Sequence, residues 1–303
     1  MFSSRENAAK LSIAAVSLLI LLKVVASILT GSISIRADAV HSAIDLVGVV
    51  VGYIGIRISG KPPDERHAFG HGKAENIASA IIAGLIFVAA GAIVYEAVKR
   101  LIVGGAIELI TIGIYVTVAA IAVNVIISWY ALRIARSTDS LALEATARDM
   151  FADMLSSCAV LVGLILVRVT GLGILDPIVA MLVSIVIARA AYLTIKKSFG
   201  GLMDTRLPQA EEDEIRACIM EYSGQLVSFH ALRTRKAGNQ RYIDLHLVVS
   251  KSASVEEAHR VCDELERGIK SRLPYSSVTI HVEPCNEECS QCSIPPDRCD
   301  KRT

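Results

Sequence analysis

The sequence contains six stretches of apolar residues that are each long enough to cross a lipid bilayer as a helix, which needs about 20 residues. With 53% hydrophobic and only 20% charged residues, the chain is more apolar than soluble domains, of which about 25% is charged. We therefore expect a polytopic α-helical membrane protein whose six transmembrane helices occupy residues 1–204. The predicted spans are residues 11–30, 33–58, 77–95, 109–132, 141–167 and 178–195.

The charges next to these spans predict the orientation of the chain. Six spans place both termini on the same side, and the side richer in Lys and Arg faces the cytoplasm. The other side has three basic residues in its loops and one at a helix end, whereas the side of the termini has ten near the bilayer. We therefore expect cytoplasmic termini and a lipid environment. The ten residues are Arg5, Lys10, Arg57, Lys61, Arg66, Lys73, Arg133, Arg136, Lys196 and Lys197.

Other classes of protein are excluded by composition. The net charge of +1 gives no electrostatic reason to expect a nucleic-acid partner. The length of 303 residues is too great for a small disulfide scaffold, and the hydrophobicity is too high for a disordered chain.

From about residue 205 the sequence predicts a small cytoplasmic domain that ends near residue 284. Pro208 precedes an acid-rich helix start, and residues 226–235 and 241–250 have the alternation of strands around a turn at Gly238. Ser254 and Glu257 form a capping box that opens a helix to about residue 273, and residues 277–282 are a third strand. The predicted order of elements is αββαβ, followed by a Cys-rich tail at residues 285–303.

Two of the predicted spans, residues 33–58 and 141–167, each carry several ionisable residues, which are costly inside a bilayer and therefore indicate function. Each carries a pair four residues apart, His41 with Asp45 and Asp149 with Asp153, and such a spacing puts both side chains on one helix face. Facing each other, the pairs would present one imidazole and three carboxylates, a set that suits a divalent cation. A proton relay or polar helix packing is the alternative.

The remaining histidines fall in two further candidate metal sites. Asp64, His67 and His71 lie in the loop after the second span. In the cytoplasmic domain, strand alternation puts His246 on the face opposite the apolar residues of its strand, and His281 on the same face as Glu283. His230 and His259 complete this set of four histidines and one glutamate, which favours a metal site over a solvated surface.

The seven cysteines give a weaker signal. Cys158, Cys218 and Cys262 fall in predicted helices, where packing is the usual role. In the tail, Cys289 and Cys292 have the spacing of thiolate ligands, but a second pair of this spacing is missing. Disulfides are not expected in a reducing cytoplasm. A thiolate metal site remains one interpretation, and its candidate residues are Cys285, Cys289, Cys292 and Cys299.

Together, three groups of residues resemble the cation diffusion facilitator family, and within it the bacterial ferrous-iron and zinc efflux type. They are Arg36-Ala-Asp-Ala-Val-His-Ser-Ala-Ile-Asp45, Phe69-Gly-His-Gly-Lys-Ala-Glu75, and His230-Ala-Leu-Arg-Thr-Arg235 with Ile280-His281, supported by the pair on the fifth span. The resemblance covers about residues 8–285. It implies a homodimer in the inner membrane of a prokaryote that exports divalent metal in exchange for protons, with a metallochaperone-like cytoplasmic domain and without organic cofactor or enzymatic activity.

The resemblance also implies a role for each candidate residue. His41, Asp45, Asp149 and Asp153 form the transport site, and Asp64, His67 and His71 the loop site. His230, His246, His259, His281 and Glu283 form a binuclear site at the dimer interface. An interlock between Lys73 and Asp204 holds the protomers together near the membrane surface. Zn²⁺ is the expected substrate and regulatory or structural ligand, with Fe²⁺, Mn²⁺, Co²⁺ and Cd²⁺ as further candidates.

Two features depart from the family pattern. The efflux type has its histidine on the fifth span, whereas this chain has Asp149 there and the histidine at His41, which leaves metal preference open. Val282 stands where close relatives have a polar residue. The main alternative function is a membrane-anchored metal sensor without transport, although an anchor does not need four ionisable ligands in its spans. A membrane metalloenzyme is disfavoured because the sequence has neither HExxH nor GxSxG.

Overall fold

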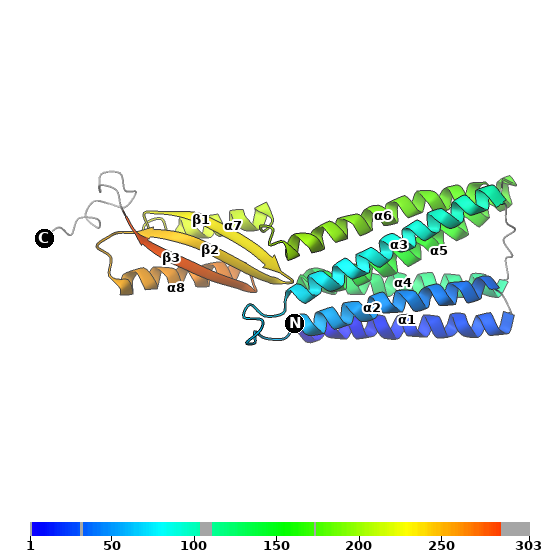
Figure 1. Cartoon of the computed structure of the whole chain (residues 1–303), viewed down its shortest axis with the longest axis horizontal. Coiled ribbons are helices and arrows are strands. Elements are labelled where there is room, and N and C mark those ends of the chain that lie inside the picture. The colour runs from blue at the N-terminus through cyan, green and yellow to red at the C-terminus, as the bar shows by residue number, and fades with distance from the viewer. Residues whose placement is uncertain (1, 31–32, 104–110, 173, 286–303) are drawn as a thin grey trace. The chain divides into compact units, whose positions relative to one another are not determined.

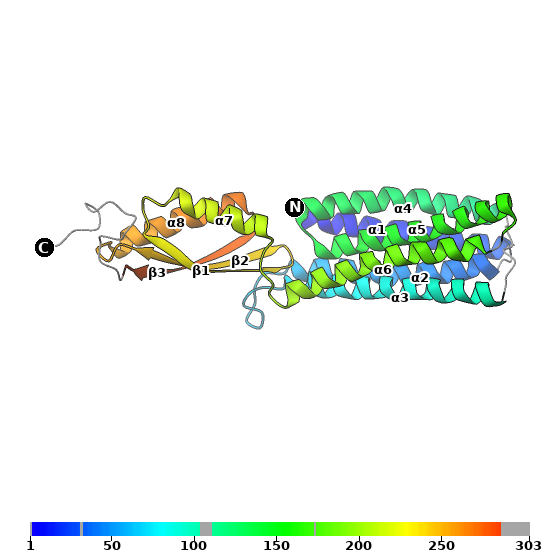
Figure 2. The ribbon, with the colours of Figure 1, turned by 90° about the horizontal axis from the view of Figure 1, so that it is seen from above.

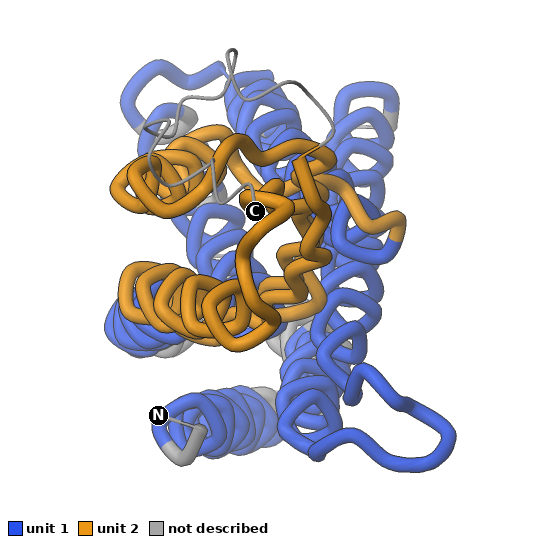
Figure 3. Tube along the Cα trace, turned by 90° about the vertical axis from the view of Figure 1, so that its left-hand side faces the viewer, with its two compact units in different colours: residues 1–202 blue, residues 203–303 orange. Residues whose placement is uncertain are grey.

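The computed structural model describes residues 2–30, 33–103, 111–172 and 174–285. The chain divides into two compact units, Met1–Leu202 and Met203–Thr303 (Figure 3). The sequence-based boundary at residue 204 lies beside this division.

Six long helices make up the described part of the first unit and run alongside one another (Figure 1). They contain 27 to 31 residues each, which at 1.5 Å per residue gives about 40–46 Å, enough to cross a bilayer. α3 packs chiefly against α6, α4 against α5, and α1 against α2. The helices are α1 (Phe2–Thr30), α2 (Ile33–Ser59), α3 (Lys73–Val103), α4 (Thr111–Thr138), α5 (Leu141–Thr170) and α6 (Leu175–Leu202).

Four of these helices, α1, α3, α4 and α6, are long and apolar enough within the described residues to cross a membrane. Large apolar side chains such as Ile28, Val88 and Ile185 lie on their exposed surface, as a lipid-facing surface requires. Within the described residues, α2 and α5 are not apolar enough to be counted with these four. They are the helices that carry His41, Asp45, Asp149 and Asp153, so a total of six spans stays a prediction.

Small residues allow the helices to approach closely, as is usual in membrane proteins. A Cβ atom at Gly52 of α2 would lie 2.4 Å from the hydroxyl of Thr146 on α5, and one at Gly201 of α6 would lie 2.0 Å from the amide of Asn76 on α3. Any larger side chain at these glycines would push the helices apart. Asn76 also donates to the carbonyl of Ser198 at 3.3 Å, which adds a polar contact between α3 and α6.

The second unit has the predicted αββαβ order in its described residues, and this part of the fold prediction is confirmed. The strands form one sheet in the order β1-β2-β3, with β1 and β2 antiparallel and β2 and β3 parallel. Parallel neighbours need a long crossover, and α8 supplies it. The elements are α7 (Gln209–Glu221), β1 (Ser228–Ala237), β2 (Gln240–Val249), α8 (Val255–Arg272) and β3 (Ser276–Pro284).

Both helices of the second unit cover the same face of the sheet (Figure 2). On β2 the side chains of Ile243, Leu245 and Leu247 are buried and pack with α7 and α8 residues such as Ile219 and Leu265. Because strand side chains alternate between faces, the intervening residues of β2 lie on the face away from the helices. The core thus determines which face is available for a site.

Local signals in the sequence explain where these elements begin and turn. The capping box of α8 is formed as predicted, since Ser254 Oγ accepts from the Glu257 backbone N–H at 3.1 Å and Glu257 accepts from the Ser254 N–H at 2.8 Å. Gly238 has a φ of +61° between β1 and β2. Both favoured two-residue hairpin turns need a positive φ at this position, which glycine adopts without strain.

A buried carboxylate connects four elements at one end of the helical unit. Glu75, near the start of α3, is fully buried and accepts hydrogen bonds from Arg5 of α1 at 2.7 Å, Ser59 of α2 at 2.9 Å and Ser140 at 2.7 Å. Ser140 directly precedes α5 and its hydroxyl also accepts from the Leu143 N–H at 3.4 Å. One side chain of α3 therefore holds α1, α2 and the start of α5.

We predict that Glu75→Ala strongly destabilises the helical unit, because the substitution removes the carboxylate that pairs with buried Arg5. Breaking a buried pair costs about 3–5 kcal/mol. Thermal unfolding of the purified protein in detergent measures this effect. Glu96→Ala is the control, since Glu96 pairs with Arg100 on the exposed surface of the same helix and such a pair contributes about 1 kcal/mol or less. Equal melting temperatures for the two variants would contradict the role of Glu75.

Candidate metal centres

The predicted transport ligands lie on two helices that pack against each other, α2 and α5. A Cβ atom at Gly48 of α2 would lie 3.2 Å from Asp149 Oδ2, so the carboxylate of Asp149 approaches α2 one turn beyond Asp45. Asp45 precedes Gly48 by three residues on α2, and Asp153 follows Asp149 by four residues on α5, so each lies about one helical turn from this approach. The two helices therefore bring three carboxylates into one region of the unit.

This arrangement is not a closed metal cage. Among the described side chains, the oxygens of Asp45, Asp149 and Asp153 are not a group whose ligand atoms all lie within 4.8 Å of one another. The backbone of His41 lies in α2, but its side chain is outside the described part of the structure. The four-residue transport site therefore stays a prediction.

Asn124 is a contact of this region that the sequence analysis missed. It lies on α4, is 3% exposed, and donates its amide N–H to Asp153 Oδ2 at 2.5 Å. The bond fixes the orientation of a predicted ligand from a third helix. The available signal was a lone asparagine in the otherwise apolar segment 109–132.

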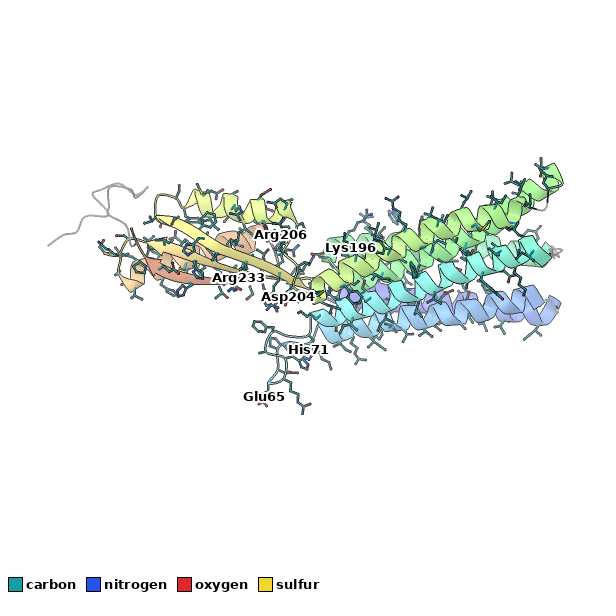
Figure 4. The ribbon with its side chains drawn as sticks, turned by 45° about the horizontal axis from the view of Figure 1, so that its top comes forward. Glu65, His71, Lys196, Asp204, Arg206 and Arg233 are labelled. Carbon is teal, nitrogen blue, oxygen red and sulfur yellow. The ribbon has the colours of Figure 1, made fainter. Side chains whose placement is uncertain are left out.

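The three predicted loop residues come together between α2 and α3. Asp64 Oδ1 lies 3.1 Å from His67 Nδ1, and Asp64 Oδ2 lies 3.3 Å from His71 Nε2. The two rings are 4.3 Å apart between centroids. All three offer ligand atoms within 4.8 Å of one another. In Figure 4 the labelled His71 lies nearer the helices than Glu65, which lies further out on the same loop.

The backbone of the loop holds the Asp64 carboxylate in place. The N–H groups of His67 and Arg66 donate to Asp64 Oδ1 at 2.7 and 2.9 Å. The hydrogen bond from the His67 backbone lowers the pKa of Asp64, so this exposed carboxylate is ionised at neutral pH. His71 Nδ1 is buried and has no hydrogen-bond partner. One carboxylate and two imidazoles with ligand atoms this close fit a divalent cation.

Three histidines form a row across the sheet of the second unit. His230 of β1 is paired with His246 of β2, which is paired with His281 of β3. The ring centroids are 5.1 Å apart between His230 and His246 and 4.9 Å apart between His246 and His281. The row lies on the face away from α7 and α8, as strand alternation predicts.

Glu283 lies two residues after His281 on the same face and closes this cluster. Its carboxylate oxygens lie 2.8 Å from His246 Nδ1, 3.3 Å from His230 Nε2 and 3.8 Å from His281 Nε2. His230, His246 and Glu283 have ligand atoms within 4.8 Å of one another. A β-bulge follows His230, where Ala231 has a φ of +52°, and this irregularity lets His230 stay in register with His246.

The other predicted residues have separate positions. His259 lies on α8, exposed, with its Nε2 3.6 Å from Asp263, and it is not part of the described cluster. Lys73 donates to the carbonyl of Leu202 at 3.3 Å in the first unit, and Asp204 lies 3.3 Å from Arg235 in the second, so the interlock stays a prediction. Cys285 is buried, and the other tail cysteines, Cys289, Cys292 and Cys299, lie outside the described residues.

Two family models match the chain. The cation efflux transmembrane domain matches residues 9–203, and the cytoplasmic domain of cation efflux proteins matches residues 207–285. The chain belongs to the cation efflux family. The resemblance that the sequence motifs indicated is thereby confirmed, and each matched segment corresponds to one of the two units.

Individual members of the cation efflux family match most of the chain. The transporter sll1263 of Synechocystis sp., described as uncharacterized, is 34% identical over 92% of this chain and 90% of its own length. The cation-efflux pump FieF of Salmonella typhi is 33% identical over 93% of each chain. Cation efflux proteins are membrane transporters, so the prediction that this chain is not an enzyme is confirmed.

Two solved structures are each similar to about a quarter of this chain. A zinc form of CzrB is 45% identical over 27% of this chain and 94% of its own, with a TM-score of 0.26. The metal-bound C-terminal domain of the CzcD transporter from Thermotoga maritima is 25% identical over 27% of this chain and 98% of its own, with a TM-score of 0.25.

We predict that Glu283→Ala weakens metal binding by the cytoplasmic domain by more than tenfold, because it removes the one carboxylate that contacts His230 and His246. Calorimetric titration of the full-length protein with Zn²⁺ measures the loss of one class of sites. Asp244→Ala is the matched control, since Asp244 lies on β2 two residues before His246 and outside the cluster. Unchanged binding in Glu283→Ala would show that Glu283 is not a ligand.

Proposed function

We propose that this cation efflux protein exports divalent metal ions, with Zn²⁺ as the preferred substrate, from the cytoplasm in exchange for protons. The observation that carries the proposal is the convergence of Asp45, Asp149 and Asp153 on the packed helices α2 and α5. Acidic groups are costly within apolar helices. Those that are retained there usually serve transport or proton transfer. Family membership makes metal transport the appropriate function.

The donor set suits several metals. Three carboxylates with His41 make an oxygen-rich site that admits Fe²⁺, Mn²⁺, Co²⁺ and Cd²⁺ as well as Zn²⁺. The Irving–Williams order favours Zn²⁺ over Fe²⁺, Mn²⁺ and Co²⁺. The name of FieF describes a cation-efflux pump, which supports this substrate class.

Exchange for protons follows from the chemistry of the ligands. A carboxylate or an imidazole must be deprotonated to coordinate a metal, so metal and protons compete for the same atoms. In the proposed cycle, metal that binds from the cytoplasm displaces protons from the site, and protons that bind from the other side displace the metal. The transport site is open to one side of the membrane at a time, and a change in helix packing switches it to the other side. The buried contacts between α2 and α5 make this change depend on whether metal or protons occupy the site.

We propose further that the protein is a homodimer and that metal binding by its cytoplasmic domain regulates transport. His230, His246, His281 and Glu283 bind metal, and His259 contributes at the interface between protomers, where the site becomes binuclear. Metal binding would shift the transport equilibrium if the metal binds more tightly to one arrangement of the dimer than to the other. The loop residues Asp64, His67 and His71 provide a further site, and Lys73 and Asp204 the interlock between protomers. A thiolate site in the tail would capture metal for transport.

A metal sensor without transport is the alternative, and the preassembled cluster of His230, His246 and Glu283 favours it. Such a sensor has no use for the carboxylates of α2 and α5. The amide of Asn124 that orients Asp153 is equally unnecessary in an anchor. Transport therefore explains more of the buried polar groups than a sensor does.

We predict that Asp153→Ala reduces Zn²⁺ transport into proteoliposomes by at least about 100-fold, since loss of a supporting residue alone costs about 10- to 100-fold. An internal pH dye records whether protons move in the opposite direction. Mn²⁺, Fe²⁺, Co²⁺ and Cd²⁺ are compared in the same assay. Glu96→Ala, on the exposed face of α3, serves as the control and should transport normally.

Each result of this assay has a distinct consequence. Zn²⁺ flux without opposing proton movement would contradict the antiport mechanism. Wild-type flux in Asp153→Ala would contradict the assignment of the transport site. No flux of any metal in the wild type, together with tight binding by the cytoplasmic domain, would favour the sensor.

We further predict that Zn²⁺ shortens the separation of the two cytoplasmic domains in the dimer. Spin labels at exposed Lys251, attached through a non-natural amino acid because the chain has seven cysteines, report this separation. Glu283→Ala should stay at the metal-free separation at Zn²⁺ concentrations that saturate the wild type. A separation that stays fixed while Zn²⁺ activates transport would show that the cytoplasmic site only holds the dimer together.

A further inference from the structure

Lys23 is a buried ammonium group within the first helix. It is the only charged residue of the predicted span 11–30, and it is 2% exposed. Its Nζ donates to the hydroxyl of Ser42 on α2 at 2.7 Å, and Ser42 is also buried, at 3% exposed. α1 and α2 therefore meet at a buried polar contact.

The position of Lys23 is not that of a lysine at a membrane surface. Lysines near helix ends extend their ammonium groups to the headgroups. Lys23 is seven residues from the end of α1 at Thr30, about 10 Å along the helix, and its ammonium points to α2 instead. A charge in this place is costly, and a charge retained inside a membrane helix usually acts in the path of an ion.

Its partner Ser42 connects Lys23 to the proposed transport site. Ser42 directly follows His41 and precedes Asp45 by three residues. Side chains three residues apart on a helix are neighbours, with about 5–6 Å between Cβ atoms. The ammonium of Lys23 therefore contacts α2 about one helical turn before Asp45.

We infer that Lys23 determines the affinity of the transport site, acting as a fixed positive charge that weakens the binding of the divalent cation. This inference rests on the proposed function. Three carboxylates in a poorly screened environment attract a divalent cation strongly, and a transporter must also release it. A nearby ammonium opposes the metal charge and balances the carboxylates when the site is empty. Lys23 is thus a positioning and affinity-determining residue rather than a ligand.

A purely structural role, in which Lys23 only joins α1 to α2, leads to different results. Lys23→Gln removes the charge but retains a donor for Ser42, whereas Ser42→Ala removes the hydrogen bond but retains the charge. Lys23→Arg keeps both a charge and a donor. Lys10→Gln is the matched control, since Lys10 lies on the same helix with an exposed side chain that pairs with Glu6.

The experiment measures the initial rate of Zn²⁺ uptake into proteoliposomes against Zn²⁺ concentration at fixed pH. We expect Lys23→Gln to lower KM about tenfold and to lower kcat, because tighter binding slows release. Lys23→Arg, Ser42→Ala and Lys10→Gln should keep KM within about twofold of the wild type. A wild-type KM in Lys23→Gln, or the same change in Ser42→Ala, would overturn the inference.

Three further outcomes are distinguishable. If both Lys23→Gln and Lys23→Met fail to fold while Lys23→Arg folds, the charge serves assembly and the inference is wrong. Asp153→Ala, assayed in parallel, tests the proposed function itself. If Asp153→Ala is inactive and Lys23→Gln resembles the wild type, only the inference fails. If Asp153→Ala transports normally, the assignment of the transport site is wrong, and the inference about Lys23 loses its basis.

Discussion

The helical unit depends on one constraint, namely that each polar or charged group buried among its apolar helices needs a hydrogen-bond partner inside the protein. Glu75 is held by Arg5, Ser59 and Ser140, and Asp153 by Asn124. Because each of these contacts joins different helices, they also determine how the helices are rotated against one another. The same kind of buried polar contact thus holds the helices together and orients a proposed transport ligand.

The second unit follows a different rule, the alternation of side chains along a strand. The same alternation that buries Ile243, Leu245 and Leu247 beneath α7 and α8 places His246 on the opposite face. Pairing with β1 and β3 then brings His230 and His281 alongside it. The hydrophobic core and the candidate metal site are consequently not independent, since a shift of register by one residue would destroy both.

These two rules explain how much of the molecule could be predicted from the sequence. Helix length and strand alternation are local patterns, so the six helices, the αββαβ order and the face of His246 were predictable. Contacts between helices depend on their rotation, which no single apolar stretch encodes. For this reason Asn124 was missed although it bonds to Asp153, and Glu75 was noted only as part of a motif. Whether His259 joins the cluster depends on packing between elements for the same reason.

The two kinds of scaffold suit the two kinds of site. Candidate ligands on neighbouring strands of one sheet are held at fixed spacing by backbone hydrogen bonds, so the sheet itself determines the positions of His246 and His281. The carboxylates of α2 and α5 lie on separate helices, joined by side-chain contacts rather than by a ladder of backbone bonds. A small shift between two helices changes the distance from Asp45 to Asp149 without unfolding either helix. Ligands that must bind an ion and then release it belong on such a pair, whereas ligands that must report metal concentration belong on the sheet.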